Sequence, residues 1–227
     1  LNNVKPKISH SPKDNNAVSR YAVSKMEPAS LGDYHIYNVE SKIKKLIARE
    51  SITVRMYGPL NVDYEKIYVF ENSERQQKEE PLKVELTLSN TEATGLGIPL
   101  PAGKIDMYTF TGSGGIEYIG SDQMGQVPKG ESSTIQAGYA FDITGKRKVL
   151  NYNRQRKSEE AVIEISVNNT RSDPVQIKIV EHINGDWVIK DQSHDYKKED
   201  ASTIQFEIDL DPGKKEYITY TYKKEWK

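Results

Sequence analysis

The chain has 227 residues, no cysteine and a nearly balanced charge, with 32 Lys and Arg against 33 Asp and Glu. The lack of cysteine excludes disulfide frameworks, thiol nucleophiles and cysteine-ligated metal sites, and the balanced charge argues against a nucleic-acid partner. No apolar run reaches the roughly 20 residues that a membrane span needs, and residues 1–30 lack the apolar run of a signal peptide.

Residues 1–30 are predicted to form an extended arm or linker that precedes the folded domains. They contain three prolines among Asn, Ser and Lys, with few apolar residues. Such a segment buries too little apolar surface to order itself. We therefore expect it to make extended backbone hydrogen bonds through residues 4–8 or 17–23, adding as a strand to its own domain or to a neighbouring subunit. Because the chain begins with Leu1, we expect it to be a fragment of a longer protein.

Residues 31–142 are predicted to form a first β domain. Alternating apolar and polar residues, which place successive side chains on opposite faces of a strand, are clearest at 82–88. One short helix is expected at 41–50, and the charged residues 71–81 are expected to form a mobile loop. The expected strands cover residues 33–39, 51–57, 64–70, 82–90, 103–110, 116–120 and 132–138.

Residues 143–227 are predicted to form a second, immunoglobulin-like β-sandwich. The alternation is strongest at 203–210, where Ile204, Phe206, Ile208 and Leu210 share one face. Asn184-Gly185 predicts a type I′ hairpin turn between two strands, and Trp187 after it is expected to be buried. The expected strands cover residues 146–155, 160–168, 174–183, 186–191, 202–210 and 215–223. The fold class is therefore all-β, with two antiparallel sandwich-like domains.

Five segments resemble a known family in their order along the chain: LGDYHIY at 31–37, LGIPLPAGKI at 96–105, PKGE at 128–131, GYAFDI at 138–143 and EHINGDW at 181–187. The family is a bacterial domain-of-unknown-function family that forms the C-terminal part of mucoidy inhibitor A-like proteins. The resemblance covers about residues 30–227. It implies a β-rich domain in exported or envelope-associated proteins, without an established activity or catalytic residues.

The LPAG element of this pattern lies in a stiff, shaped loop, because its prolines fix φ and its glycines allow unusual backbone angles. One interpretation is a structural corner between strands. The other is a recognition loop formed by Gly97, Pro99, Leu100 and Pro101.

No catalytic or metal-binding pattern stands out. His10, His35, His182 and His194 show no spacing typical of metal ligands, and the serines lack a nucleophile-elbow setting. Paired acids such as Glu159-Glu160 cannot be distinguished from local charge clusters without coordinates. We expect no cofactor and no metal.

A basic run near the middle of the chain predicts a polyanion contact, because it combines cations with an aromatic residue. A solvated strand edge is the alternative, since lysines protect such edges and Glu159-Glu160 neutralises one end. The residues of the predicted contact are Lys146, Arg147, Lys148, Tyr152, Arg154 and Arg156.

The sequence as a whole favours a non-enzymatic β-sandwich module of a bacterial envelope or cell-surface protein, outside the cytoplasm. It would act through contacts with other protein chains, including self-association by strand addition. The alternative is a carbohydrate-active enzyme or a polysaccharide-binding module.

Overall fold

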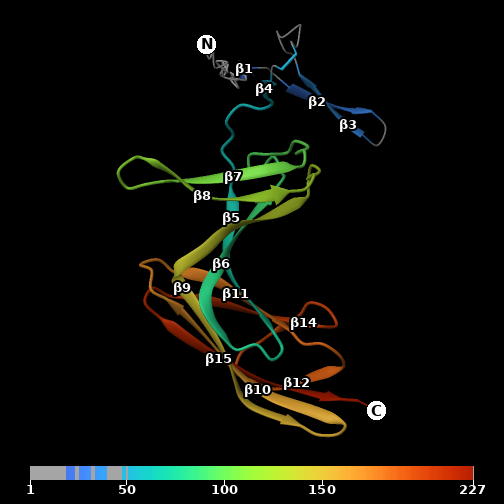
Figure 1. The fold of residues 1–227 in the computed structure, drawn as a ribbon, viewed down its shortest axis with the longest axis vertical. Helices are drawn as coiled ribbons and strands as arrows, with labels where there is room; N and C mark the ends of the chain where they lie inside the picture. The colour runs from blue at the N-terminus through green and yellow to red at the C-terminus, as the bar shows by residue number, and fades with distance from the viewer. Residues whose placement is uncertain (1–18, 24–25, 32–33, 40–47, 50, 227) are drawn as a thin grey trace, which may run out of the picture. The chain divides into compact units, whose positions relative to one another are not determined.

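In the computed structural model the chain is built from β-strands (Figure 1). The structure describes residues 19–23, 26–31, 34–39, 48–49 and 51–226, and the chain divides into two units, 1–60 and 61–227. The described residues contain no helix, so the expected all-β class is confirmed. Most of the helix expected at 41–50 lies outside the described residues, and Ala48 and Arg49 form a turn.

Unit 1 contains two pairs of strands. The first strand, β1 (Ser19–Val23), pairs in parallel with β4 (Ser51–Arg55). The second pair, β2 (Met26–Leu31) and β3 (Tyr34–Val39), is antiparallel. The expectation that the arm makes extended backbone hydrogen bonds is thus confirmed at β1, with a strand of the same chain as partner. Residues 4–8 lie outside the described residues.

Unit 2 is built around one nine-stranded sheet with the order β12-β15-β10-β9-β6-β5-β11-β14-β13. All its neighbouring strands are antiparallel except β5 and β11. A separate hairpin of β7 and β8 completes the unit. The strands are β5 (Tyr64–Ser73), β6 (Lys78–Ser89), β7 (Gly103–Phe110), β8 (Ile116–Met124), β9 (Ser132–Arg154), β10 (Ser158–Asn169), β11 (Val175–His182), β12 (Trp187–Gln192), β13 (Lys197–Lys198), β14 (Thr203–Leu210) and β15 (Lys215–Glu225).

The nine-stranded sheet folds over on itself around a single core. Phe206 of β14 packs against Tyr220 of β15, with ring centroids 5.7 Å apart, although five strands separate β14 from β15 in the sheet order. The predicted inward residues of β14 are all buried. β9 crosses the expected boundary between residues 142 and 143 without interruption, so the division into two sandwiches is not confirmed.

Two local predictions are wrong. Gly185 has a positive φ of 84°, but Asn184 does not have a positive φ, so the predicted type I′ turn, which needs both, is not formed. The flanking strands also do not pair with each other, because β11 joins β5 and β14 while β12 joins β15. The turn therefore links the two sides of the folded sheet. The loop expected at 71–81 is a tight β5–β6 connection, because both strands extend into it.

The expected burial of Trp187 is confirmed, since only 7% of its surface is exposed. Its indole Nε1 donates to the carbonyl oxygen of Ala201 at 3.0 Å. Ile189, two residues along β12, also packs against the core. The turn thus delivers β12 to the edge of the sheet with its first residue pointing inward.

Candidate functional site

An open groove of about 650 Å³ lies between the β7–β8 hairpin and strands β5, β6 and β9. Aromatic and aliphatic side chains dominate its walls, and Lys66 and Arg171 are its cations. Among the residues that the structure describes, no Asp or Glu lines it. The aromatic members are Tyr64, Tyr68, Tyr108, Tyr139 and Phe141.

Two irregularities in β9 turn aromatic side chains outward at this groove. Ala137 and Gly138 together oppose Val84, and Gly138 adopts a φ of 89°. Further along, residues 141–143 of β9 have no partner on β6. β-Bulges re-aim side chains and often lie beside functional sites. Here they leave Phe141 88% exposed, which is unusual for so large an apolar residue.

The β7–β8 hairpin carries a second group of exposed apolar side chains. Phe110 at its tip is 80% exposed, and Ile116 opposite it is also exposed. Behind them Tyr108 and Tyr118 meet edge to face, with centroids 5.5 Å apart. Residues 112–115 form the turn, where the N–H of Thr111 donates to the carbonyl oxygen of Gly115 and closes the loop.

Asp122 fixes the hairpin to the main sheet. Its Oδ2 accepts from the backbone N–H of Gln136 in β9 at 2.8 Å, and its Oδ1 accepts from the N–H of Gln123. These backbone hydrogen bonds hold the pKa of Asp122 below its usual value. Strand β8 therefore faces β9, and the outer edge of β7 is left without a strand partner among the described residues.

The end strands of the nine-stranded sheet are protected in a way that β7 is not. β13 has only two residues. In β12 the register shifts between Lys190 and Gln192, and Asp191 adopts a φ of 40°. Short strands, bulges and lysines are the usual means by which proteins block pairing at sheet edges.

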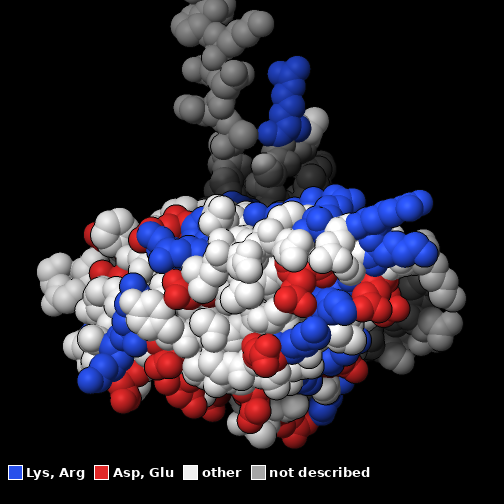
Figure 2. All heavy atoms as spheres, turned by 90° about the horizontal axis from the view of Figure 1, so that it is seen from below, with Lys and Arg blue, Asp and Glu red and all other residues white. Residues whose placement is uncertain are grey.

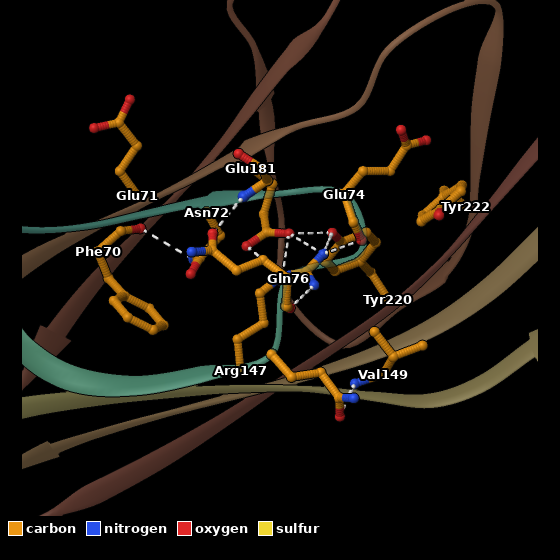
Figure 3. Close-up of polar contacts among 12 residues, drawn as sticks. Phe70, Glu71, Asn72, Glu74, Gln76, Arg147, Val149, Glu181, Tyr220 and Tyr222 are labelled. Carbon is orange, nitrogen blue, oxygen red and sulfur yellow. Dashed lines mark hydrogen bonds and ion pairs between the residues drawn. The ribbon is translucent and has the colours of Figure 1, made fainter.

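The prediction that Arg147 contacts a polyanion is wrong, because this side chain is buried in the core. Its guanidinium pairs with Glu181 and donates to the backbone carbonyls of Glu74 and Gln76, as Figure 3 shows. The hydroxyl of Tyr220 donates to the same carboxylate. Because side chains alternate along β9, Arg147 points inward while its two lysine neighbours point outward.

The other residues of the predicted polyanion contact divide into two groups. Lys146 forms an ion pair with Glu79, and Lys148 pairs with Glu164 at 3.2 Å. Tyr152 donates its hydroxyl to Glu159 Oε2 at 2.9 Å. Arg154 and Arg156 lie at the far end of β9, where neither forms an ion pair with a described residue, so the structure separates them from the rest of the run.

Glu159 is a second buried acid, with 3% of its surface exposed. Its Oε2 also accepts from Arg75 at 2.9 Å, and its Oε1 accepts from the hydroxyl of Tyr222 at 3.2 Å. Burial, followed by the charge of Glu159, raises the pKa of Tyr222. This carboxylate is fully engaged inside the protein and does not face a cleft.

The predicted recognition loop is clamped from beneath by Asn90, which is completely buried. The Asn90 side chain donates to the carbonyl oxygens of Ile98 and Val127 and accepts from the N–H groups of Gly97 and Ile98. Leu100 and Val127 exchange two further backbone hydrogen bonds of 3.0 Å. Gly97, Pro99, Leu100 and Pro101 of this loop are half-buried, which fits the structural-corner interpretation. Recognition by the loop stays a prediction.

Two of the three described histidines, His182 and His194, have ordinary partners. His182 contacts Glu71 and Thr203, and His194 contacts Ser193 and Glu216. His10 lies outside the described residues, and His35 belongs to β3. Within the described ranges no group of three or more His, Asp or Glu side chains could hold a metal ion.

The sequence interpretation missed the aromatic groove and the free edge of β7. A usable signal was present, since Met107-Tyr108 and Tyr118-Ile119 each place two large apolar residues at consecutive positions. A strand that packs against the core with one face buries only alternate residues. One of two adjacent apolar residues must therefore lie on its other face. The bulges of β9 left no comparable signal.

Comparisons with protein-family models, with curated proteins and with solved structures found no match to this chain. In the part of the chain that the structure describes, no helix has the length and apolar character of a membrane span.

Proposed function

We propose that this chain is a non-enzymatic module of a bacterial envelope or cell-surface protein, and that it acts by self-association through the β7–β8 hairpin. The observation that carries the proposal is the outer edge of β7, which has no strand partner among the described residues and is flanked by exposed aromatic residues. The envelope location rests on the family resemblance of the sequence. The hairpin supports the mode of action.

A free strand edge presents a row of unpaired N–H and C=O groups, and a second chain can satisfy them. An edge can pair antiparallel with a copy of itself about a two-fold axis, which makes the contact closed and self-complementary. In such a pairing Tyr108 and Phe110 of one chain would contact Tyr108 and Phe110 of the second chain. Aromatic cross-strand pairs stabilise antiparallel sheets by about 0.2–1 kcal/mol each.

The groove would extend this contact. Tyr139 and Phe141 lie on its β9 wall, and Tyr108 belongs both to the groove and to β7. A second chain paired with β7 could therefore cover apolar surface on both sides of the hairpin. Exposed apolar patches of this kind mark interaction sites in soluble proteins.

The test is sedimentation velocity over a wide range of protein concentration. The wild-type protein should shift toward a dimer as its concentration rises, because association follows mass action. The double variant Tyr108→Lys, Phe110→Lys should remain monomeric, since lysines on an edge strand oppose pairing. Both positions are exposed, so the variant should unfold at nearly the wild-type denaturant concentration.

Val188→Lys is the matched control. Val188 is an exposed apolar residue on β12, the edge strand of the main sheet. This variant should associate as the wild type does. A wild-type protein that stays monomeric throughout, or equal loss of association in both variants, would contradict the proposal.

The enzymatic alternative gains no support at the groove. A glycosidase needs two carboxyl groups on either side of the scissile bond, and none of the described residues that line this groove is an acid. Glu159 and Glu181 are buried and bonded inside the sheet.

A further inference from the structure

The end of β9 and the turn that joins it to β10 carry three exposed cations, Arg154, Arg156 and Lys157. A backbone hydrogen bond of 2.8 Å from Gln155 N–H to the Ser158 carbonyl closes the turn. None of the three cations forms an ion pair with a residue that the structure describes. Their charges therefore remain available at the surface, unlike those of the lysines earlier in β9.

Trp226 is fastened to this turn at two points. Its indole Nε1 donates to the carbonyl oxygen of Arg156 at 3.1 Å, and its backbone N–H donates to the carbonyl oxygen of Lys157 at 3.1 Å. The Arg154 guanidinium lies over the ring, 5.7 Å from its centroid. With 37% of its surface exposed, the indole forms one wall of an open cavity of about 620 Å³.

The neighbouring acids do not neutralise this site. In the sequence Glu159 and Glu160 directly follow the turn and suggest that its charge is cancelled. In the structure Glu159 points into the core, and Glu160 pairs with Lys190 at 3.4 Å. Glu225, which also lines the cavity, forms an ion pair with Lys223.

We propose that Arg154, Arg156, Lys157 and Trp226 form a binding site for a linear anionic polysaccharide. The apolar face of a sugar ring can stack on the indole, and its carboxylate or sulfate group can accept paired hydrogen bonds from a guanidinium. A nucleic acid is disfavoured because it needs a broad basic face. The end of unit 2 seen in Figure 2 instead mixes acidic and basic side chains, with basic groups protruding at one edge.

The proposal goes beyond self-association and concerns a different part of unit 2. Figure 1 shows the β7–β8 hairpin and the C-terminus at opposite ends of this unit, with β9 running from one toward the other. A failure at one site therefore leaves the other unaffected.

The experiment is a titration of the protein with dextran sulfate, with polygalacturonate, with neutral dextran and with duplex DNA. Binding is followed by polymer immobilisation and by the change in tryptophan emission. We expect one or both anionic polysaccharides to bind and neutral dextran not to bind. Dextran sulfate alone would identify sulfate as the recognised group, and polygalacturonate would identify carboxylate. With three cations involved, affinity should fall on the order of tenfold when salt rises from low to physiological concentration.

The triple variant Arg154→Gln, Arg156→Gln, Lys157→Gln should lose at least about tenfold in affinity, because electrostatic contacts supply most of the binding to a linear polyanion. The matched control is Lys129→Gln, Lys197→Gln, Lys214→Gln, which removes the same charge at three other exposed positions. This control should bind almost as the wild type does. Trp226→Phe should abolish the emission change, because Trp187 is buried.

Three results would overturn the proposal. One is equal loss of binding in the two triple variants, which would indicate a general charge effect. Another is unchanged emission of Trp226 at saturating polymer. The third is the lack of preferential binding to either anionic polysaccharide, seen as binding to none of the polymers or as stronger binding to duplex DNA.

Discussion

Arg147 of β9 and Glu181 of β11 form an ion pair, with 2.8 Å between Nη2 and Oε2, inside the core of the folded sheet. Their strands are not neighbours, because β6 and β5 lie between them in the sheet order. Both side chains are completely buried. The pair therefore joins two sides of the fold, and the further bonds of Arg147 to Glu74 and Gln76 attach the β5–β6 turn.

Arg147→Ala should destabilise the protein by about 3–5 kcal/mol, because it leaves the Glu181 carboxylate buried without its countercharge. The measurement is urea unfolding followed by circular dichroism. Replacing both partners, as Arg147→Met with Glu181→Leu, should cost less than Arg147→Ala alone. A loss below about 1 kcal/mol for Arg147→Ala, the usual effect of a surface change, would show that Glu181 does not depend on this partner in the core.

Glu71 should make stability depend on pH in the acidic range. Hydrogen bonds from Lys83 and from His182 lower the pKa of Glu71 from 4.5 to about 2. A carboxyl group with a depressed pKa stabilises the fold above its unfolded pKa and loses this effect as the pH falls. The contribution of Glu71 should therefore be complete above about pH 4.5 and vanish between pH 4.5 and pH 2.

The check compares Glu71→Gln with the wild-type protein by urea unfolding near pH 7 and near pH 2. Glu71→Gln should be less stable near neutral pH, and the difference should shrink toward zero in acid. Glu117→Gln, the same change at an exposed position of β8, serves as the control. A stability difference that is independent of pH would rule out the ion-pair explanation.

The sequence predicted most strands of unit 2 because their alternation reflects burial on one face, as Phe206 and Ile208 of β14 illustrate. The sequence did not predict equally well which strands pair with each other. Asn184-Gly185 favours only certain local backbone angles, whereas pairing depends on which side of the folded sheet each strand reaches. The inward position of Arg147 also escaped prediction, since each bulge in β9 shifts the phase of the alternation.

The candidate sites were predictable only in part. The sequence identified Arg154 and Arg156 as cations near an aromatic residue, but it named Tyr152, whose hydroxyl is bonded to buried Glu159. The aromatic partner at the turn is Trp226, about 70 residues away in sequence. Antiparallel pairing of β10 with β15 brings Trp226 to the turn, and this pairing leaves no local pattern.

Gly145→Ala should destabilise the core by about 1–3 kcal/mol through overpacking. A Cβ atom at Gly145 would lie 2.7 Å from the ring of Phe70, which is completely buried. Gly145 pairs with Glu80 on one side and Val167 on the other, so the backbone has little room to shift. Gly103→Ala is the control, because nothing lies within 4 Å of its added Cβ.

Urea unfolding of the two glycine variants measures the difference. Adding Phe70→Leu to Gly145→Ala should cost less than the sum of the two single changes, because the smaller side chain relieves the contact. Equal stability of Gly145→Ala and Gly103→Ala would mean that the Phe70 ring can move aside freely.

Trp187 and Trp226 should differ sharply in their contributions to stability. Trp187 is buried, donates to the carbonyl of Ala201, and has the Lys198 ammonium 4.4 Å from its ring centroid. Trp187→Ala should therefore cost about 3–5 kcal/mol, as is usual for a buried tryptophan. Trp187→Phe should cost less, because it keeps most of the packing, although it loses the hydrogen bond.

The same unfolding measurement applied to Trp226→Ala should give a much smaller loss than Trp187→Ala, because the Trp226 ring is partly exposed at the β9–β10 turn. Near-ultraviolet circular dichroism of the two variants provides a second test, since a fixed indole in the core contributes most of the signal. If Trp187→Ala lowered stability by less than about 1 kcal/mol, the usual effect of a surface change, Trp187 would not anchor β12 to the core.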